Sequence, residues 1–391
     1  MDFEAAFYIS LAFLGIILLA GSSIRPKDED TAFFDRILSK EIRGSLAVFI
    51  ILHHTVITLT HFGTDMENMM PFTNYYFYGI LAVAFYFFCS GFGLIKRQMS
   101  EKDYTKGFMK RRIFTVLVPY FICNYIYLTE ALLGNIKYGN HFTFTEVICA
   151  FFGLFLVNNQ MWFAVEIMIL YVAFRIIFGI VKKVRTGIIL LTSVVIIMIV
   201  IGFFSGHSGS LTMSYWFKGE WWYNTILMFP AGMLYAYKED RINRIIRKAF
   251  TAVIISSSVL LVLLDYIHRV LIGRQIYYPE LSVTRHPALD RLTGLTAETA
   301  LELVFLILLI TILSRVRIGN PVLKFLGKIS LEIIMLNFLM AEHLFFIYER
   351  YGIGFYLPAV LLSTVVAASF VYLIKNLVLE RRSGLLDGDV R

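Results

Sequence analysis

Long apolar runs, separated by short polar and basic segments, recur along almost the whole chain. Many of them approach the length of about 20 residues that an α-helix needs to cross a bilayer. We therefore expect eleven membrane spans and an all-α polytopic transmembrane bundle, with about ten core spans and one N-terminal span before them. The expected spans are Phe3–Gly21, Glu41–His61, Tyr76–Ile95, Ile113–Leu133, Met161–Val181, Gly187–Phe204, Asn224–Tyr237, Phe250–Ile267, Glu298–Leu313, Ile329–Ile347 and Phe355–Ile374.

One apolar run does not fit this series. Thr143–Val157 is short for a span and is followed by the polar residues Asn158-Asn159-Gln160. If it crossed the membrane, the basic residues after the next span would lie outside, against the positive-inside rule. We expect it to be a re-entrant or interfacial helix.

The basic segments between the runs predict the orientation of the chain. Placing them in the cytoplasm puts the N-terminus outside and the C-terminus inside a cell membrane. The exception is the expected external loop His268–Ala297, which contains four arginines. We expect an N-terminal span and linker over residues 1–40, a membrane domain over 41–380 and a cytoplasmic tail over 381–391.

The composition agrees with a membrane protein and excludes several other classes. Hydrophobic residues make up 58% of the chain and charged residues 16%, with a mean hydropathy of +0.71. Soluble domains have about 45–50% apolar and about 25% charged residues. The net charge of +8 comes from short basic loops, so we expect a lipid bilayer and no nucleic acid as partner. The three cysteines show no CxxC spacing, so neither a disulfide framework nor a metal site is expected.

The first candidate site lies on the run Glu41–His61. Arg43 and His54 are eleven residues apart, which on a helix places them within about 20° of one face and about 16 Å apart along the axis. A cation and an imidazole in one apolar helix are costly and indicate a function. The alternatives are a positive-inside anchor for Arg43 and a packing role for His54. His53 lies about 100° around the helix, so one histidine can line a cavity while the other packs.

Further polar residues within the expected spans are candidates for the same site. Glu166 lies about 6 Å deeper than Trp162, at a depth similar to that of His54, where a carboxylate can orient an imidazole. The alternative for Glu166 is a structural ion pair or a protonated acid between helices. Ser90-Gly91 indicates a close helix approach. Glu298 and Glu302 share a helix face, and with Glu332 and Asn337 they could line a polar pathway, so a transporter stays possible.

A cluster of basic residues lies on the expected cytoplasmic side. It consists of Lys96, Arg97, Lys106, Lys110, Arg111 and Arg112. Such a cluster can bind the phosphates of a nucleotide-like ligand. As a topology signal it needs no ligand, and both interpretations stay open at this point.

Six segments in order resemble the membrane-bound acyltransferase family 3, the O-acetyltransferase-like integral membrane proteins. The resemblance covers roughly residues 42–376. It is carried by Arg43-Gly44 with His54, AFYFFCSGF (84–92), FMKRRIFTVLVPY (108–120), MWFAVEIMILY (161–171), FPAGM (229–233) and FLGKISLEIIML (325–336). The chain departs from the family pattern at Asn337, where a histidine is usual.

The resemblance implies transfer of an acyl group, most often acetyl from cytoplasmic acetyl-CoA, to a hydroxyl of a cell-envelope carbohydrate or glycolipid. His54 would be the general base or carry the acyl group, and Glu166 would position it. Arg43 and Lys110, Arg111 and Arg112 would hold the CoA phosphates. We place His53, Ser90, Trp162 and Asn337 at the lining of the pocket. The alternatives are a transporter of a glycan or lipid-linked intermediate and a non-catalytic structural subunit.

Overall fold

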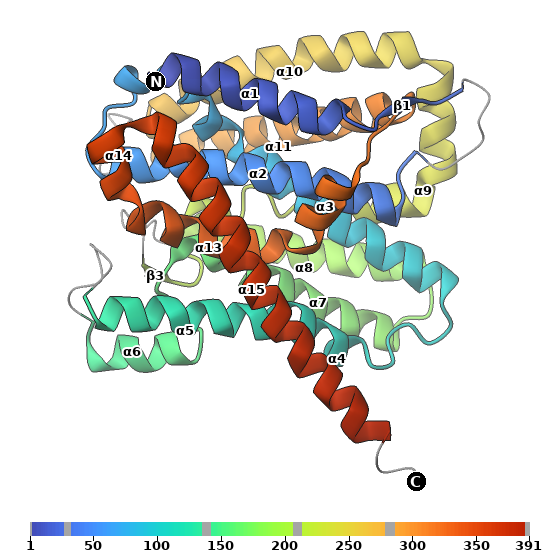
Figure 1. Ribbon diagram of the computed structural model, residues 1–391. Helices are drawn as coiled ribbons and strands as arrows, with labels where there is room; N and C mark the ends of the chain where they lie inside the picture. The colour runs from blue at the N-terminus through green and yellow to red at the C-terminus, as the bar shows by residue number, and fades with distance from the viewer. Residues whose placement is uncertain (1, 27–32, 135–141, 206–212, 278–285, 388–391) are drawn as a thin grey trace.

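Helices form nearly all of the regular structure in the computed structural model, which describes residues 2–26, 33–134, 142–205, 213–277 and 286–387 (Figure 1). The α-helices are α1 Phe3–Leu19, α2 Arg36–His61, α3 Asn74–Ser100, α4 Phe108–Arg112, α5 Val118–Leu132, α6 Phe144–Phe151, α7 Trp162–Ile180, α8 Val184–Phe204, α9 Met228–Lys248, α10 Phe250–Gly273, α11 Pro287–Leu313, α12 Pro321–Lys328, α13 Ser330–His343, α14 Phe345–Tyr351 and α15 Ile353–Asp387. The π-helical turn Ile113–Leu117 joins α4 to α5, and 3-10 turns lie at Glu67–Met69, Asn159–Met161 and Glu220–Trp222.

Two small antiparallel sheets tie distant parts of the chain together. Strand β1 (Ser23–Ile24) pairs with β4 (Val316–Arg317) and joins the end of α1 to the end of α11. Strand β2 (Phe155–Leu156) pairs with β3 (Ser214–Tyr215), so the segment before α7 is held against the segment before α9.

The chain is an all-α polytopic membrane bundle, but it has fewer clear spans than expected. Among the described residues, eight helices are long and apolar enough to cross a membrane, or nine if the bent pair α13 and α14 forms one span. Two expected spans account for the difference from eleven. Helix α1 has only 17 residues, and the apolar part of α9 ends at a bend at Lys238, beyond which the helix is polar.

Expected boundaries also shift where helices continue. Helix α2 begins at Arg36, so the last residues of the expected linker 1–40 form its first turns. Helix α15 runs to Asp387, so the expected tail 381–391 begins inside a helix, and residues 388–391 lie outside the described residues. The segment Thr143–Val157 is too short to cross, as expected. It forms the eight-residue α6, which Thr143 and Glu146 cap, and then strand β2.

The burial of the helices separates a central block from a periphery. In α2, 72% of the most apolar stretch is buried inside the protein, whereas only 6% of the corresponding stretch of α10 is. Helix α2 packs against α3, α12 and α13, while α10 packs mainly against α11. Any site on α2 is therefore enclosed by other helices, and α10 faces the surroundings of the bundle.

Glycines permit the closest helix contacts in the central block. A Cβ atom at Gly91 in α3 would lie 2.0 Å from the carbonyl oxygen of Phe229, and one at Gly232 in α9 would lie 2.1 Å from that of Phe88. These two glycines come from the SGF and FPAGM segments. Small residues let transmembrane helices approach closely, so the close approach expected at Ser90-Gly91 is confirmed.

The crossing of α2 and α12 is built in the same way. A Cβ atom at Gly44 would lie 2.2 Å from the carbonyl oxygen of Leu323, and one at Gly327 would lie 1.9 Å from that of Lys40. Gly44 follows Arg43 directly, so this crossing fixes the backbone that carries the arginine.

Candidate functional site

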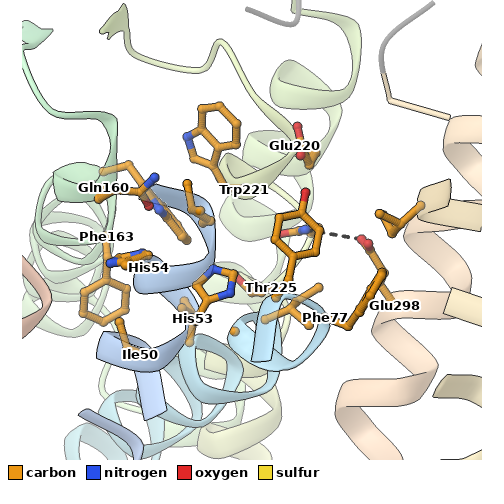
Figure 2. Close-up of a pocket in the computed structure, with 18 of the residues that line it drawn as sticks. Ile50, His53, His54, Phe77, Gln160, Phe163, Glu220, Trp221, Thr225 and Glu298 are labelled. Atoms are coloured by element: carbon orange, nitrogen blue, oxygen red, sulfur yellow. Dashed lines mark hydrogen bonds between the residues drawn. The ribbon is translucent and has the colours of Figure 1, made fainter. Parts of the chain in front are cut away.

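His54 lies in the wall of a cavity of about 420 Å³. Its side chain is only 5% exposed. Figure 2 shows the imidazole beside Gln160 and Phe163, with His53 close by. Other walls of the cavity come from α3, α7, α10, α11, α13 and the segment around Glu220–Thr225. The volume is within the range of about 300–1,000 Å³ that is typical of small-molecule sites.

Asn337 on α13 orients the His54 ring. Its Oδ1 lies 2.5 Å from His54 Nδ1. Its Nδ2 donates to the carbonyl oxygens of Ile333, at 2.9 Å, and Ile334, at 3.0 Å. Because these carbonyls can only accept, the amide nitrogen must face them and Oδ1 must face His54. The proton of a neutral imidazole then lies on Nδ1, and Nε2 keeps its lone pair.

The other side of the His54 ring is polar as well. The side chain of Gln160, which precedes α7, lies beside the ring and also lines the cavity (Figure 2). Phe338 packs edge-on against the imidazole, with 6.4 Å between ring centroids. Packing and the hydrogen bond to Asn337 thus hold the imidazole in one orientation, with the unprotonated Nε2 available for proton transfer.

His53 also lines the cavity, although the helical spacing alone allowed one histidine to pack elsewhere. Its Nδ1 lies 3.2 Å from the carbonyl oxygen of Tyr75. A Cβ atom at Gly79 would lie 2.6 Å from the ring, so the absence of a side chain there makes room for the imidazole. The centroids of the two imidazoles are 5.2 Å apart.

Arg43 lies on the same helix as His54, eleven residues before it. Its Nε donates to the carbonyl oxygen of Ser39 at 3.2 Å. Its own carbonyl oxygen accepts a 2.8 Å hydrogen bond from the hydroxyl of Tyr86, which lines the cavity. In the described part of the chain, no carboxylate lies within 4.0 Å of the half-buried guanidinium. Among the described residues the guanidinium is therefore a cation without an acidic partner, although Arg43 itself is not in the cavity lining.

The structure does not bring Glu166 to His54. The carboxylate is fully buried on α7, but it does not line the cavity, and neither oxygen has a hydrogen-bond partner among the described residues. The orienting contact that the sequence suggested for Glu166 is made by Asn337 instead. Trp162, one turn before Glu166, does line the cavity and packs 6.1 Å from Trp222 between ring centroids.

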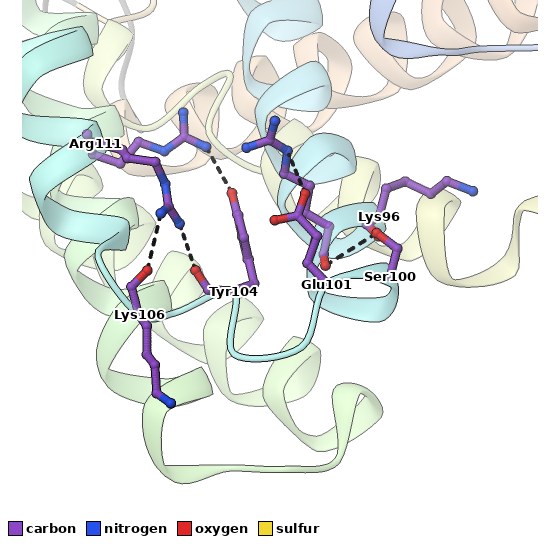
Figure 3. A network of polar contacts seen from close by, with 8 residues as sticks. Lys96, Ser100, Glu101, Tyr104, Lys106 and Arg111 are labelled. Carbon is purple, nitrogen blue, oxygen red and sulfur yellow. Dashed lines mark hydrogen bonds and ion pairs between the residues drawn. The ribbon is translucent and has the colours of Figure 1, made fainter. Parts of the chain in front are cut away.

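The basic cluster after α3 is largely engaged within the protein (Figure 3). Arg111 donates to the carbonyl oxygens of Tyr104, at 2.9 Å, and Lys106, at 3.2 Å. Arg112 donates to the Tyr104 hydroxyl at 3.2 Å. These bonds fix the turn between α3 and α4, whereas the Lys110 side chain is exposed. A structural role therefore accounts for both arginines.

Ser90 belongs to this region and not to the cavity wall. Its hydroxyl lies 2.8 Å from that of Tyr171, and the Tyr171 ring in turn faces the Arg112 guanidinium at 4.4 Å. The expected pocket-lining role of Ser90 is therefore not seen in this cavity, and Asn337, also expected in the lining, lies behind His54 instead.

Sequence reasoning named Glu298 for a polar pathway but missed the polar groups that surround it at the far side of the cavity. Glu298 on α11 accepts hydrogen bonds from Tyr277, at 2.5 Å, and Asn224, at 3.3 Å, and its Oε1 lies 3.4 Å from His268 Nδ1. Glu298 stood out as an acid inside a span. The partners could not be found from helical spacing, because they come from the segment before α9 and from the end of α10.

The comparison with protein families gives one match. The model of an acyltransferase domain matches residues 42–374, which is most of the chain and includes Arg43, His54 and Asn337. No curated protein and no solved structure matches the chain.

Proposed function

Since the family match shows that this chain belongs to the acyltransferase 3 family, we propose that it is an integral membrane O-acyltransferase. The proposed reaction moves acetyl from cytoplasmic acetyl-CoA to a hydroxyl of a cell-envelope carbohydrate or glycolipid. The observation that carries the proposal is the buried His54 imidazole, which Asn337 holds by Nδ1 at the wall of a cavity large enough for a substrate.

His54 is the general base in this proposal. Nε2 takes the proton of the acceptor hydroxyl as its oxygen attacks the thioester carbonyl. The new C–O bond forms, the C–S bond breaks, and the protonated imidazole returns the proton to the CoA thiolate. The amide oxygen of Asn337 accepts from Nδ1 throughout, so the ring does not turn between the two proton transfers.

Arg43 is the proposed contact for the donor. Its guanidinium lacks an acidic partner among the described residues, and its backbone is bonded to Tyr86 at the cavity floor. If Arg43 binds a phosphate of CoA, the pantetheine arm would extend past Tyr86 towards His54. Lys110, with its exposed side chain, is the member of the basic cluster best suited to join it. Arg111 and Arg112 would have to exchange their bonds to the Tyr104 turn for phosphate.

Glu166 has no direct step in this scheme, because it contacts neither His54 nor the cavity. The proposed orientation keeps the basic segments and the C-terminus in the cytoplasm, the N-terminus outside and the mouth of the cavity towards the outer face of a cell membrane.

The competing function is a transporter of a glycan or lipid-linked intermediate. The observation that favours it is the buried Glu302, one turn from Glu298 on α11, whose carboxylate has no partner among the described residues. Intramembrane acids often mark transport pathways. Thiol release from acetyl-CoA separates the two functions, because a transporter does not cleave a thioester.

The test uses purified protein in nanodiscs, acetyl-CoA and envelope glycan extracted from cells that lack the protein. We expect thiol release that depends on the glycan, with an equal amount of ester-linked acetyl on it. His54→Ala should abolish both, while His53→Ala, its neighbour in the same cavity, should retain a substantial part. Glycan-independent thiol release, or equal losses in the two variants, would contradict the assignment of His54.

A further inference from the structure

Two acidic side chains line the far side of the cavity. Among the described residues, no lysine or arginine lines it, whereas Glu220 and Glu298 both do. The nearby Arg269 is committed elsewhere. Its Nε lies 2.8 Å from Asp265 Oδ2 and its Nη1 donates to Asn74 at 3.0 Å. The cavity therefore presents a negative surface at the end that is remote from Arg43.

Glu298 is held rigidly at this end. Figure 2 shows its carboxylate turned towards the segment that carries Thr225. Tyr277 and Asn224 donate to Oε2, and His268 lies beside Oε1. The side chain is only 2% exposed. Because its two donors come from two different segments, the carboxylate has a fixed position before any ligand arrives.

Two further groups in the same wall lack partners. Asn224 Oδ1 and Thr225 Oγ1 are buried and make no hydrogen bond within the described residues, although both side chains line the cavity. Asn224 is 7% and Thr225 is 2% exposed. Buried polar groups are nearly always hydrogen-bonded, and an amide oxygen can only accept. The Asn224 Oδ1 therefore lacks a hydrogen-bond donor, and a ligand can supply one.

We propose that Asn224, Thr225 and Glu298 form the subsite for the acyl acceptor and that it selects an amino-bearing or neutral polyol over an anionic one. Calling the ligand an acyl acceptor rests on the proposed function. The preference for one ligand charge over another is a property of binding and can be measured without the reaction. Hydroxyl or ammonium groups donate to Asn224 Oδ1 and Thr225 Oγ1, and an ammonium group gains from the charge of Glu298. A carboxylate or phosphate on the ligand meets the like charge of Glu298.

The same charge pattern sorts the two substrates of the proposed reaction. The phosphates of CoA are excluded from an acid-lined cavity and meet the cation at Arg43 instead. The acceptor and the donor therefore reach His54 from opposite sides.

Three probes with one ring and different charge test the subsite: glucosamine, glucose and glucuronate. Their binding to the full-length protein in nanodiscs at neutral pH can be titrated by saturation-transfer NMR. We expect glucosamine to bind most tightly and glucuronate at least about tenfold more weakly, since like charges at close range cost several kcal/mol. Equal affinities, a preference for glucuronate or no saturable binding of any probe overturn the proposal.

Glu298→Gln removes the charge and keeps the shape of the side chain. It should reduce the preference for glucosamine over glucuronate to a few-fold. Glu302→Gln is the matched control, because it lies one turn away on the same helix but does not line the cavity, and it should leave the preference unchanged. An unaltered preference in a folded Glu298→Gln variant overturns the proposal.

Thr225→Val provides a second test that does not depend on the carboxylate. The loss of one hydrogen bond should weaken all three probes by roughly 2- to 12-fold without changing their order. Unchanged affinities would remove Thr225 from the subsite and overturn the assignment.

The subsite proposal and the acyltransferase proposal can be refuted independently of each other. His54→Ala should keep the order of the three probes and lose thiol release. If the order holds while the wild-type protein releases no thiol with any acceptor, the acyltransferase proposal fails and the subsite stands. If thiol is released but glucuronate is bound as well as glucosamine, the subsite proposal fails and the acyltransferase stands.

Discussion

Replacing Asn337 by leucine tests whether an amide sets the reactive form of His54. Leucine has a similar size but cannot accept a hydrogen bond from the Nδ1–H group of His54. In the wild-type protein Nδ1 lies 2.5 Å from Asn337 Oδ1, and the amide is fully buried, so water does not replace it. The variant therefore leaves a buried N–H group without a partner, or the ring moves its proton to Nε2. In the second case the nitrogen that faces the substrate is no longer a base.

The expected size of the effect follows from the cost of that unsatisfied group. Leaving one buried donor unpaired costs about 1–3 kcal/mol, and each 1.36 kcal/mol in the barrier corresponds to about tenfold in rate. We expect kcat for thiol release to fall by about 5- to 150-fold in Asn337→Leu, with little change in the KM for acetyl-CoA, because Asn337 does not line the cavity.

The assay compares initial rates at saturating acetyl-CoA with the folding of each variant. Asn124→Leu is the matched control, because it removes another buried amide, 1% exposed, that donates to the carbonyl oxygen of Ala150 away from the cavity. Histidine 15N spectra in nanodiscs, with the His54→Ala spectrum subtracted, report the tautomer directly. Wild-type kcat in a folded Asn337→Leu variant, or an equal loss in Asn124→Leu, would refute the reasoning.

Four further predictions follow from other contacts. Gly91→Ala should prevent the close contact of α3 with α9 and lower the yield of folded protein, whereas Gly93→Ala, with nothing within 4 Å of the added Cβ, should not; equal yields in gel filtration would contradict this. Lys375→Met should destabilise the protein by about 3–5 kcal/mol, because it leaves the buried carboxylate of Glu332 on α13 without its cationic partner. The double variant Lys375→Met/Glu332→Leu should recover most of this loss in thermal unfolding. Arg43→Lys should keep expression but weaken acetyl-CoA binding by roughly 10- to 150-fold through the loss of one charge-assisted hydrogen bond of about 1.5–3 kcal/mol; an unchanged titration would return Arg43 to the role of an anchor. In a variant without native cysteines, Lys218→Cys should react with an impermeant maleimide outside the cell and Lys102→Cys only after permeabilisation; both side chains are exposed, so the reverse result would invert the orientation.

The apolar pattern was sufficient to predict those features of the structure that a single helix determines. It predicted the helical bundle, the non-crossing segment after residue 143 and the position of His54 and Trp162 in the cavity wall. It overestimated the spans at α1 and α9, because a run of apolar residues does not reveal how far a helix continues or where it bends. A length of 17 residues and a bend at Lys238 decide those two cases.

The partners within the site could not be predicted in this way. His54 and Asn337 are 283 residues apart, and only the packing of α13 on α2 joins them. Matching depth made Glu166 the better candidate, but depth along the membrane normal does not say which way a side chain points. The partners of Glu298 show the same limit, because they depend on how the segment before α9 and the end of α10 meet α11.

The position of the His54 imidazole, between Arg43 and the acid-lined wall, has a bioenergetic consequence for the proposed reaction. Acetyl leaves a thiol on the cytoplasmic side and arrives at a hydroxyl on the outer side, while one proton travels from that hydroxyl through His54 to the thiol. The transfer is therefore an electroneutral exchange of an acylium equivalent for a proton. A membrane potential acts on each net charge with about 2.3 kcal/mol per 100 mV. It does no net work here, so sealed vesicles should acylate at the same equilibrium with and without an imposed voltage.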